Sequence, residues 1–495
     1  MRRTGTLAIC AVVLGYASVV QGGGENQFAH LALVRSLAEG TPVVDEYHRE
    51  SKDLAWDNGH YYSTKAPGLA FLTVGPYFVL DRTGLLDASA DALGTDQRSL
   101  ALWVLVLIGA VLPAALLLFL LRAVGDDIEP GRGAVTAVTA GLCTLLFPFA
   151  TVFFDHVLAA ALGFAAFFLL FRLPDRLAVT ALAGLVAGLA ITAEYPLGLV
   201  GVAVGAYALR EGDRLRRGAC YASGVVAGVL PLLLYNWWAF GSPTHLSYEN
   251  AIIEPGISGH DVLGANDEGL YGVGVPQHGV AMQLLFSRIG LITVTPVVLA
   301  GAAGLVLTWR RGWKWEAGLA GFLTVAYVVY NSGYGTPFGG GTPGPRFLVP
   351  MLPFLAVGFA CAYRAWPWQT LALAVPSGLI MLGTTATDPL RNVDWAWFER
   401  VWDGTFAGSG IWPKLPLAAC VVAAVVLCAL ATPISRPTAG QAASAALTLG
   451  LYIAVAFSGP RLAGTNPELL LLLVAGCILA VVASHQWLRP ATQTH

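Results

Sequence analysis

The sequence predicts an all-α polytopic membrane protein, and three observations support this prediction. Charged residues make up 12% of the 495 residues, whereas soluble domains have about 25%. Hydrophobic residues make up 56%, and the mean hydropathy is +0.66. The apolar residues fall in long uncharged runs, such as Ala134 to Ala150, rather than in pieces of strand length. Runs of this length are typical of helices that cross a bilayer, so an ordinary soluble enzyme is excluded.

Net charge and cysteine content exclude two further classes of protein. The formal net charge of −2 argues against a nucleic-acid partner, because phosphate neutralisation requires a basic surface. The seven cysteines lie in or beside apolar runs, which argues against a disulfide framework or a C-x-x-C metal site. We expect these cysteines to be small core residues.

A transmembrane helix needs about 20 apolar residues, and about fourteen runs approach this length, so we predict about 12–14 transmembrane helices. In chain order these runs are 5–22, 98–121, 133–150, 156–171, 177–193, 195–209, 219–238, 289–308, 316–331, 347–363, 368–385, 414–431, 441–457 and 467–484.

The distribution of lysine and arginine predicts the orientation in the membrane. One set of short loops holds most of them, for example Arg122, Arg210 and Arg311, whereas the opposite short loops hold only Arg346 and Arg461. Basic loops face the cytoplasm. We therefore expect both termini to be cytoplasmic, and two long hydrophilic loops, about 23–97 and 239–288, to be extracytoplasmic. Any chemistry is expected at this outer face of a multi-pass cell membrane protein.

The first outer loop is predicted to carry helices that lie in the membrane interface. Residues 28–35 have the apolar spacing of an amphipathic helix on the membrane surface. Residues 66–80 are apolar but contain Pro67 and Pro76, and counting them as a span would invert the later loops against the pattern of basic residues. We expect them to form a second interfacial helix.

Three carboxylates of this loop are candidate catalytic bases. Glu25, Asp45 and Asp53 have aromatic or apolar neighbours at the predicted bilayer edge. A partly desolvated carboxylate has a raised pKa, which suits it to general-base work. The sequence does not distinguish among the three.

Ionisable residues beside the spans form a second group of candidates, because each is costly in a membrane. Asp155 and His156 lie in a short outer turn, and Glu194 lies at the end of another span. Asp155 can either cap the following helix, paired with His156, or serve a site. The same two interpretations are open for Glu194.

Arg346 and Lys65 are candidate phosphate-binding cations. Arg346 follows the glycine-rich stretch 339–344, and such a turn offers backbone amides while the guanidinium offers a bidentate fork. A snorkelling interfacial arginine is the alternative. Lys65, beside Pro67 and Gly68, supplies a second cation on the same side.

These residues together resemble the GT-C superfamily of integral-membrane glycosyltransferases, which contains protein O-mannosyltransferases and lipid A aminoarabinose transferases. In that superfamily an acidic residue follows the first helix, and a Tyr-x-x-Lys-Pro-Pro-like motif closes the first outer loop. Glu25 and the stretch 62–68 occupy these places. Asp155 matches the second acidic residue, Arg98 matches an arginine entering the second helix, and residues 344–353 resemble a Gly-Pro-Arg-Tyr-Leu-x-Pro-x-x-Pro pattern.

Two other stretches, 235–236 and 240–243, are also similar to these bacterial relatives, and the resemblance spans about residues 20 to 360. Two departures stand out: Ala66-Pro67-Gly68 replaces the paired prolines, and Glu25 replaces the usual aspartate. The resemblance implies a catalytic transmembrane module over residues 1–363, followed by C-terminal transmembrane helices over 364–495 that carry no recognisable chemistry.

The activity implied by the resemblance is transfer of a hexosyl or pentosyl group from a polyprenyl-phosphate-linked donor. The acceptor, a lipid, glycan or protein, would be met at the outer face. An outer-loop carboxylate would deprotonate this acceptor, while Lys65, Arg346 and Arg98 would bind the donor phosphate. Asp155 and His156 would orient the acceptor or hold a divalent metal ion, and metal use is left open.

Further candidates on the acceptor or metal side come from both outer loops: Tyr62, Glu194, Tyr248 and Glu249. The second loop, which also holds His260, Asp267, Glu268 and His278, either covers the site or is a solvated connector.

Two other functions are compatible with parts of the sequence. A transporter or flippase of lipid-linked sugars would need ionisable residues near the bilayer midplane, whereas the charges here collect at the outer rim. A ligase of a different fold would use a late outer loop rich in arginine. Residues 386–413 offer Arg391 and Arg400 beside several tryptophans, which are more typical of an interfacial belt.

Overall fold

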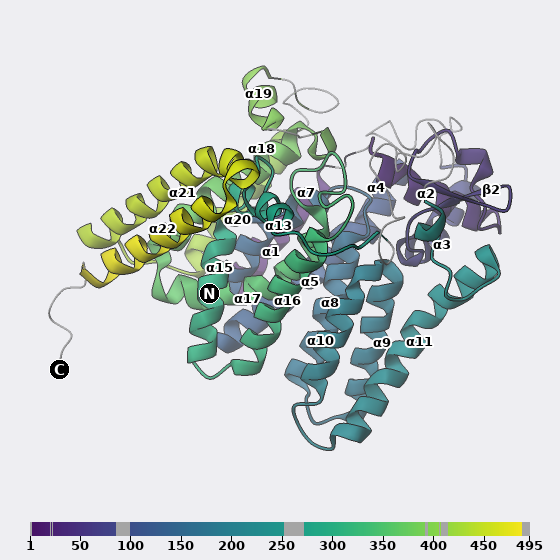
Figure 1. Ribbon diagram of the computed structural model, residues 1–495, viewed down its shortest axis with the longest axis horizontal. Coiled ribbons are helices and arrows are strands. Elements are labelled where there is room, and N and C mark those ends of the chain that lie inside the picture. The colour runs from purple at the N-terminus through teal and green to yellow at the C-terminus, as the bar shows by residue number, and fades with distance from the viewer. Residues whose placement is uncertain are drawn as a thin grey trace.

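Helices make up most of the protein in the computed structural model, in agreement with the predicted fold class (Figure 1). The structure describes residues 2–19, 21, 23–85, 100–251, 272–391, 395–404, 406 and 414–487. Within them, five helices are long and apolar enough to cross a membrane, and a sixth span results if two helices bent by 89° count as one. Shorter apolar helices accompany these spans. Each of the predicted apolar runs contains a helix.

The first outer loop folds into a small unit at one end of the helices, on the right in Figure 1. It follows α1 (Arg2–Ala17) and consists of α2 (Glu25–Ala38), the 3₁₀ turn η1 (Asp45–Tyr47), β1 (Leu54–Asp57), β2 (His60–Ser63) and α3 (Gly68–Arg82).

The two strands form an antiparallel hairpin that the sequence analysis did not predict. Leu54 pairs with Ser63 and Asp57 with His60. The turn residues Asn58 and Gly59 have φ angles of 50° and 87°, and an Asn-Gly pair favours such a tight turn because both residues tolerate positive φ. Asn58-Gly59 was therefore the signal in the sequence for this hairpin.

Residues 28–35 form a helix as expected, and its place on the membrane surface stays a prediction. They belong to α2, which is buried on more than one side. Ala29 and Ala32 pack with the hairpin residue Leu54, while His30 faces Phe153 on another face. The hairpin and the later helices cover the polar positions that an isolated amphipathic helix would expose. Residues 68–82 form α3 as expected, and its place in the interface stays a prediction.

The next helices run from the second span to the second outer loop. Their bounds are α4 (Leu100–Val106), the π-helical turn η3 (Leu107–Val111), α5 (Leu112–Ile128), α6 (Gly133–Cys143), α7 (Leu146–Phe149), α8 (His156–Arg172), α9 (Leu177–Ala193), η4 (Tyr195–Leu197), α10 (Gly198–Ala208), α11 (Arg214–Phe240) and η5 (Ser247–Asn250).

Helices α9 and α11 approach each other closely through glycine. Gly188 on α9 faces Gly228 on α11, while Gly184 lies against Tyr221 and Gly224 lies against Ala181. A Cβ atom added at Gly184 would clash with the carbonyl oxygen of Tyr221. Glycines spaced four residues apart allow such contact between membrane helices, where tight packing replaces the hydrophobic effect as the source of association.

The remaining helices form the second half of the bundle. They are α13 (His278–Phe286), α14 (Leu291–Val294), α15 (Val297–Arg310), α16 (Lys314–Ser332), η6 (Arg346–Met351), α17 (Leu352–Ala365), α18 (Pro367–Thr387), η7 (Pro389–Arg391), α19 (Ala396–Trp402), α20 (Leu415–Ala431), α21 (Ala439–Thr465) and α22 (Pro467–Trp487). The bent pair joins at Pro296, which lacks the N–H needed to continue a helix.

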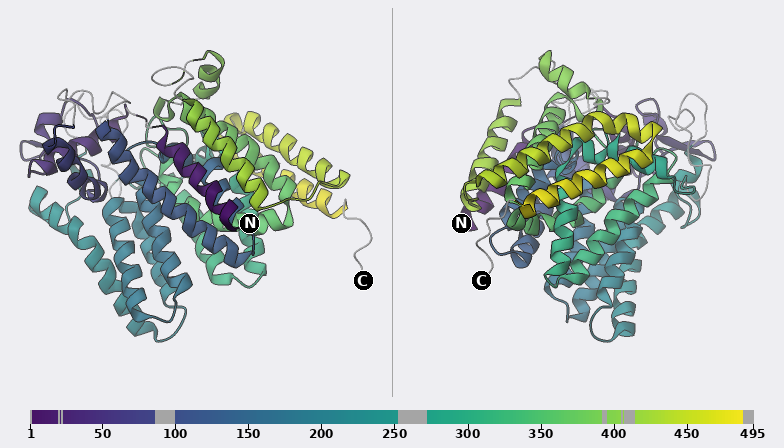
Figure 2. Two further views of the ribbon diagram at one scale, coloured as in Figure 1. Left: turned by 180° about the vertical axis from the view of Figure 1, so that it is seen from behind. Right: turned by 60° about the vertical axis from the view of Figure 1, so that its left-hand side comes forward.

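Segments far apart in the sequence lie side by side in this bundle. Helix α1 packs along α20, as the left view of Figure 2 shows, and Gly15 lies against Cys420. The side-chain amide of Gln21 donates to the carbonyl of Thr385 at 2.5 Å. The C-terminal helices therefore contact the start of the first outer loop.

Ion pairs join the basic connections at the end of the helices opposite the hairpin. Arg210, beside the α10–α11 connection at the foot of Figure 1, pairs with Glu316 at 2.7 Å. Glu129 pairs with Arg311 and also with Arg364, the latter at 3.4 Å. The loops predicted to be cytoplasmic thus meet at one end of the molecule.

Candidate active site

Most of the predicted site residues line one cavity of about 420 Å³. The cavity lies between five segments of the chain: the start of α2, the end of the hairpin, the turn before α8, the turn after α9, and the glycine-rich stretch before η6. The predicted residues that line it are Glu25, Asp53, Lys65, Asp155, His156, Glu194, Tyr248 and Arg346.

Asp45, one of the three predicted bases, does not line the cavity. One of its carboxylate oxygens accepts from the backbone N–H of Tyr61 at 2.6 Å, and the other pairs with His60 Nδ1 at 2.7 Å. Both partners belong to β2. Asp45 therefore fastens η1 to the hairpin on the outer surface of this unit.

Tyr62 and Glu249, which were predicted on the acceptor or metal side, are also absent from the cavity lining. The Tyr62 side chain is buried, with its ring 4.8 Å from that of Phe240. Glu249 accepts from the backbone N–H of Leu246 at 3.0 Å and so caps η5. The predictions for Arg98, His260, Asp267 and Glu268 fall outside the described residues.

Lys65 and Asp53 form a buried ion pair on one wall of the cavity. Thr64 Oγ1 donates to Asp53 Oδ1 at 2.6 Å, so both carboxylate oxygens are engaged. The end of β2 positions this pair, because the backbone N–H of Lys65 donates to Ser63 Oγ at 3.2 Å. Burial lowers the pKa of the Lys65 ammonium, and the charge of Asp53 opposes that effect.

Arg346 lies between two aromatic rings and a glycine-rich wall. Its guanidinium carbon is 5.0 Å from the ring centre of Phe347 and 5.6 Å from that of Phe154. A side chain at Gly339 would clash with the guanidinium, so this glycine admits the arginine into the site. Arg346 Nε is buried and has no hydrogen-bond partner among the described residues. A donor held in this way is available to an anion.

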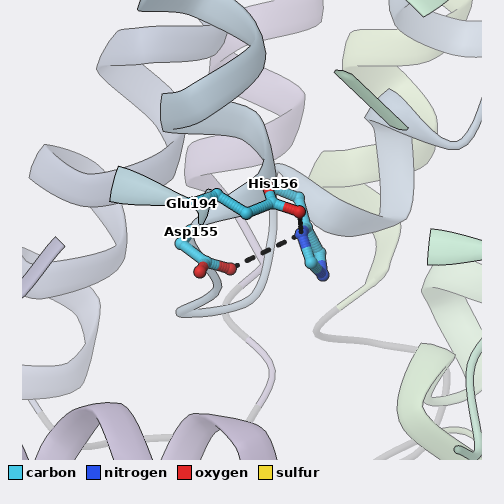
Figure 3. Close-up of side chains that lie close together, drawn as sticks. All are labelled: Asp155, His156 and Glu194. Atoms are coloured by element: carbon cyan, nitrogen blue, oxygen red, sulfur yellow. Dashed lines mark ion pairs between the residues drawn. The ribbon is translucent and has the colours of Figure 1, made fainter. Parts of the chain in front are cut away.

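Asp155, His156 and Glu194 form a compact buried cluster at the N-terminus of α8 (Figure 3). His156 Nδ1 lies 3.1 Å from Glu194 Oε1 and 3.5 Å from Asp155 Oδ1. Asp155 and Glu194 stand at helix ends, but neither side chain makes a capping hydrogen bond. The capping interpretation therefore fails for both residues.

The cluster suits a divalent cation. One ligand atom from each of the three residues lies within 4.8 Å of the others. Apart from the ion pairs with His156 and His30, Asp155 Oδ1, both nitrogens of His156 and both carboxylate oxygens of Glu194 are buried without a hydrogen-bond partner among the described residues. Carboxylate oxygens and imidazole nitrogens are ligands for Zn²⁺ and other divalent metals. Buried polar atoms without partners are expected to meet an ion or a ligand.

The pKa values of the two carboxyl groups of the cluster are shifted in opposite directions. Burial raises the pKa of Glu194 more than His156 lowers it. Burial also acts to raise the pKa of Asp155, but the imidazoles of His156 and His30 hold it below its usual range. Asp155 is therefore the more strongly ionised carboxylate of this pair.

The cavity also contains residues that the sequence analysis did not assign to the site. Aromatic and apolar walls come from Tyr334, Phe347 and Leu390. Leu390 belongs to η7, in the C-terminal part where no chemistry was expected, and its side chain lies against Gly24. Gly24 allows this contact because it has no side chain, and no local pattern in the sequence predicts the contact.

No family model matches the chain, and no curated protein matches it. Solved structures similar to it include ArnT from Cupriavidus metallidurans bound to undecaprenyl phosphate, at 16% identity and a TM-score of 0.44, covering 95% of this chain and 76% of that one. Another is the Archaeoglobus fulgidus oligosaccharyltransferase tethered to an acceptor peptide, at 13% identity and a TM-score of 0.47, covering 89% and 56%.

Proposed function

We propose that this protein is a membrane glycosyltransferase that moves a sugar from a polyprenyl-phosphate-linked donor to an acceptor at the extracytoplasmic face of the cell membrane. One observation carries the proposal: a single cavity combines two buried cations, Lys65 and Arg346, with a separate set of carboxylates. Cations suit the phosphate that leaves, and a carboxylate suits the hydroxyl that attacks.

The location of the cavity supports its assignment to the outer face. The basic loops lie at the other end of the helices, beside Arg210, Arg311 and Arg364. Since basic loops remain in the cytoplasm, the cavity would open on the opposite side. Nucleotide sugars are cytoplasmic, so a donor used at the outer face needs a lipid carrier.

Arg346 is the principal phosphate ligand in this proposal. Its free Nε and planar guanidinium match phosphate oxygens. The backbone of the stretch 339–341 lines the same wall. Lys65 would exchange part of its contact with Asp53 for the phosphate, which shifts positive charge toward the leaving group. The two cations together would stabilise the charge that develops as the sugar–phosphate bond breaks.

Glu25 is the general base in this proposal. Its Oε2 accepts from the backbone N–H of Lys52 at 2.6 Å, which orients the carboxylate. The side chain is exposed to the cavity, and its Oε1 has no hydrogen-bond partner among the described residues. Asp53 is less suited to this role because Lys65 and Thr64 engage both of its oxygens.

The reaction follows from these assignments. An acceptor hydroxyl oxygen attacks the anomeric carbon of the donor sugar, and Glu25 takes the hydroxyl proton. The bond between the anomeric carbon and the phosphate oxygen breaks, and its electron pair remains on the phosphate. Polyprenyl phosphate then leaves Arg346 and Lys65. The aromatic residues Tyr248 and Tyr334 line the space that the sugar or the acceptor would occupy.

Asp155, His156 and Glu194 would hold a divalent cation beside these groups. When bound, such an ion supplies positive charge to an oxygen of the donor phosphate or the acceptor. The fit rests on the orphaned, buried ligand atoms of the three residues.

Binding of polyprenyl phosphate to the purified protein tests the proposal. We expect Arg346→Ala and Lys65→Met each to weaken binding by about 10-fold or more, since each removes a charged hydrogen-bond donor. Arg364→Ala, at the far end of the helices, is the control and should bind as the wild type does. Equal binding by all four proteins would contradict the phosphate site. Movement of a lipid-linked sugar across a vesicle membrane without sugar transfer would instead favour a flippase.

A further inference from the structure

His30 is a buried histidine that the proposed reaction does not use. It lies in the middle of α2 and has no exposed surface. Neither ring nitrogen has a hydrogen-bond partner among the described residues. A polar group left unpaired in a protein interior is destabilising, so such a group requires an explanation.

The ring of His30 points at the carboxylate of Asp155. Its Nε2 lies 3.7 Å from Asp155 Oδ1, and the same oxygen lies 3.5 Å from His156 Nδ1. This oxygen is buried between two imidazoles. The separation to His30 exceeds that of an N–H···O bond by about 0.8 Å, a gap that a small rotation of the Asp155 side chain would close.

The backbone around this contact is firmly held. Gln27, one turn before His30 on α2, accepts from the backbone N–H of Phe153 at 3.0 Å. The backbone N–H of Gln21 donates to the carbonyl of Thr151 at 2.9 Å. The rings of His30 and Phe153 meet edge to face, with centroids 6.1 Å apart. Helix α2 and the turn before α8 therefore keep His30 directed at Asp155.

We propose that His30 is a positioning residue that orients Asp155 for a divalent cation. With its proton on Nε2, His30 would donate to Asp155 Oδ1 and so fix the orientation of this carboxylate toward the ion that His156 and Glu194 would share. His30 itself is not among the three residues whose ligand atoms converge. Residues that hydrogen-bond to a metal ligand without touching the metal fix the orientation of that ligand. The inference rests on the cation site of the proposed function.

Titration of the purified protein with Mn²⁺, followed by the paramagnetic resonance signal of the free ion, tests this role without any turnover. His30→Phe fills the same space and keeps a ring against Phe153 but removes the donor. We expect it to weaken Mn²⁺ binding by about 10-fold or more. His30→Gln restores an N–H donor and should bind within about threefold of the wild type, and this rescue would not follow from a loss of packing.

The matched control is His60→Gln, because His60 pairs with Asp45 outside the cavity, and it should leave Mn²⁺ binding unchanged. If His30→Phe does not fold, His30→Asn replaces it, since the shorter amide retains polarity but loses reach. Equal Mn²⁺ binding by the wild type and by the folded donor-deficient variant would overturn the role of His30 alone. Absence of Mn²⁺ binding in the wild type would overturn the cation site, and the inference with it, but not the phosphate site.

Discussion

Glu25, Asp53 and Asp155 are chemically similar, but the protein places them in three different settings. Glu25 is exposed to the cavity and oriented by one backbone amide. Asp53 is neutralised by Lys65, and Asp155 is buried between two imidazoles. Since the setting of a carboxylate decides its task, we propose a different role for each: base for Glu25, structural counter-ion for Asp53 and cation ligand for Asp155.

Substitution of Glu25 tests the base. We expect Glu25→Gln to lower the rate of sugar transfer by about 10²- to 10⁴-fold, the usual contribution of a general base, with donor binding unchanged. Asp45→Asn, outside the cavity, serves as the control and should have a mild effect. Comparable mild losses in both variants would place the base elsewhere.

The lowered pKa of Lys65 predicts a limit at alkaline pH. A lysine is charged below its pKa, so the positive charge at the phosphate site is lost as the pH rises through the pKa of Lys65. Because the pKa of Lys65 lies below the ordinary value of 10.5, we expect phosphate binding to fall before that pH. Lys65→Arg should move this fall to higher pH, since arginine stays charged. A pH profile of polyprenyl phosphate binding that is identical for both proteins would contradict the assignment.

At the scale of elements, the contact between α9 and α11 holds the end of α9 that carries Glu194. Glycines on both helices allow their backbones to touch. The same contact therefore supports the fold and helps to place one member of the proposed cation site.

A leucine in this contact should destabilise the protein. Gly224→Leu would drive a side chain into the carbonyl of Ala181, and overpacking of this kind costs about 1–3 kcal/mol. We expect a lower Tm in detergent. Gly450→Leu makes the same change at an exposed position of α21, where nothing lies within 4 Å of an added Cβ atom, and it should leave Tm unchanged. Equal Tm values for the two variants would show that the helices can separate without loss.

At the scale of the whole molecule, the cavity and the basic connections occupy opposite ends of the helices. Ion pairs join the basic loops through Glu129 and Glu316, while the hairpin unit lies beside the cavity. This polarity gives the molecule an expected orientation in the membrane.

Cysteine labelling in intact cells tests this orientation. In a background without the native cysteines, we expect Glu46→Cys, on the hairpin unit, to react with a reagent that does not cross the membrane. Glu211→Cys, beside Arg210, should react only after the cells are opened. Both positions are exposed. The reverse pattern would place the cavity in the cytoplasm and remove the reason for a lipid-linked donor.

Composition and pattern in the sequence predict the class of fold, the helices and most of the charged residues of the cavity. Long apolar runs can satisfy their backbone hydrogen bonds in lipid only as helices, so composition and pattern were sufficient for these elements. Arg346 and Lys65 stood out because isolated cations beside apolar runs are costly. The Asn58-Gly59 pair also favours the turn of the hairpin.

The packing of the helices sets which candidate site residues lie close together and which side chains each of them contacts. Asp45 and Asp53 look alike in the sequence, yet one fastens η1 to β2 and the other pairs with Lys65 in the cavity. His30 and Leu390 contribute through contacts with residues more than 100 positions away. Local patterns report the propensity and burial of a segment, whereas the partners of a side chain depend on how helices pack, and that packing is set by close contacts such as those of the glycines.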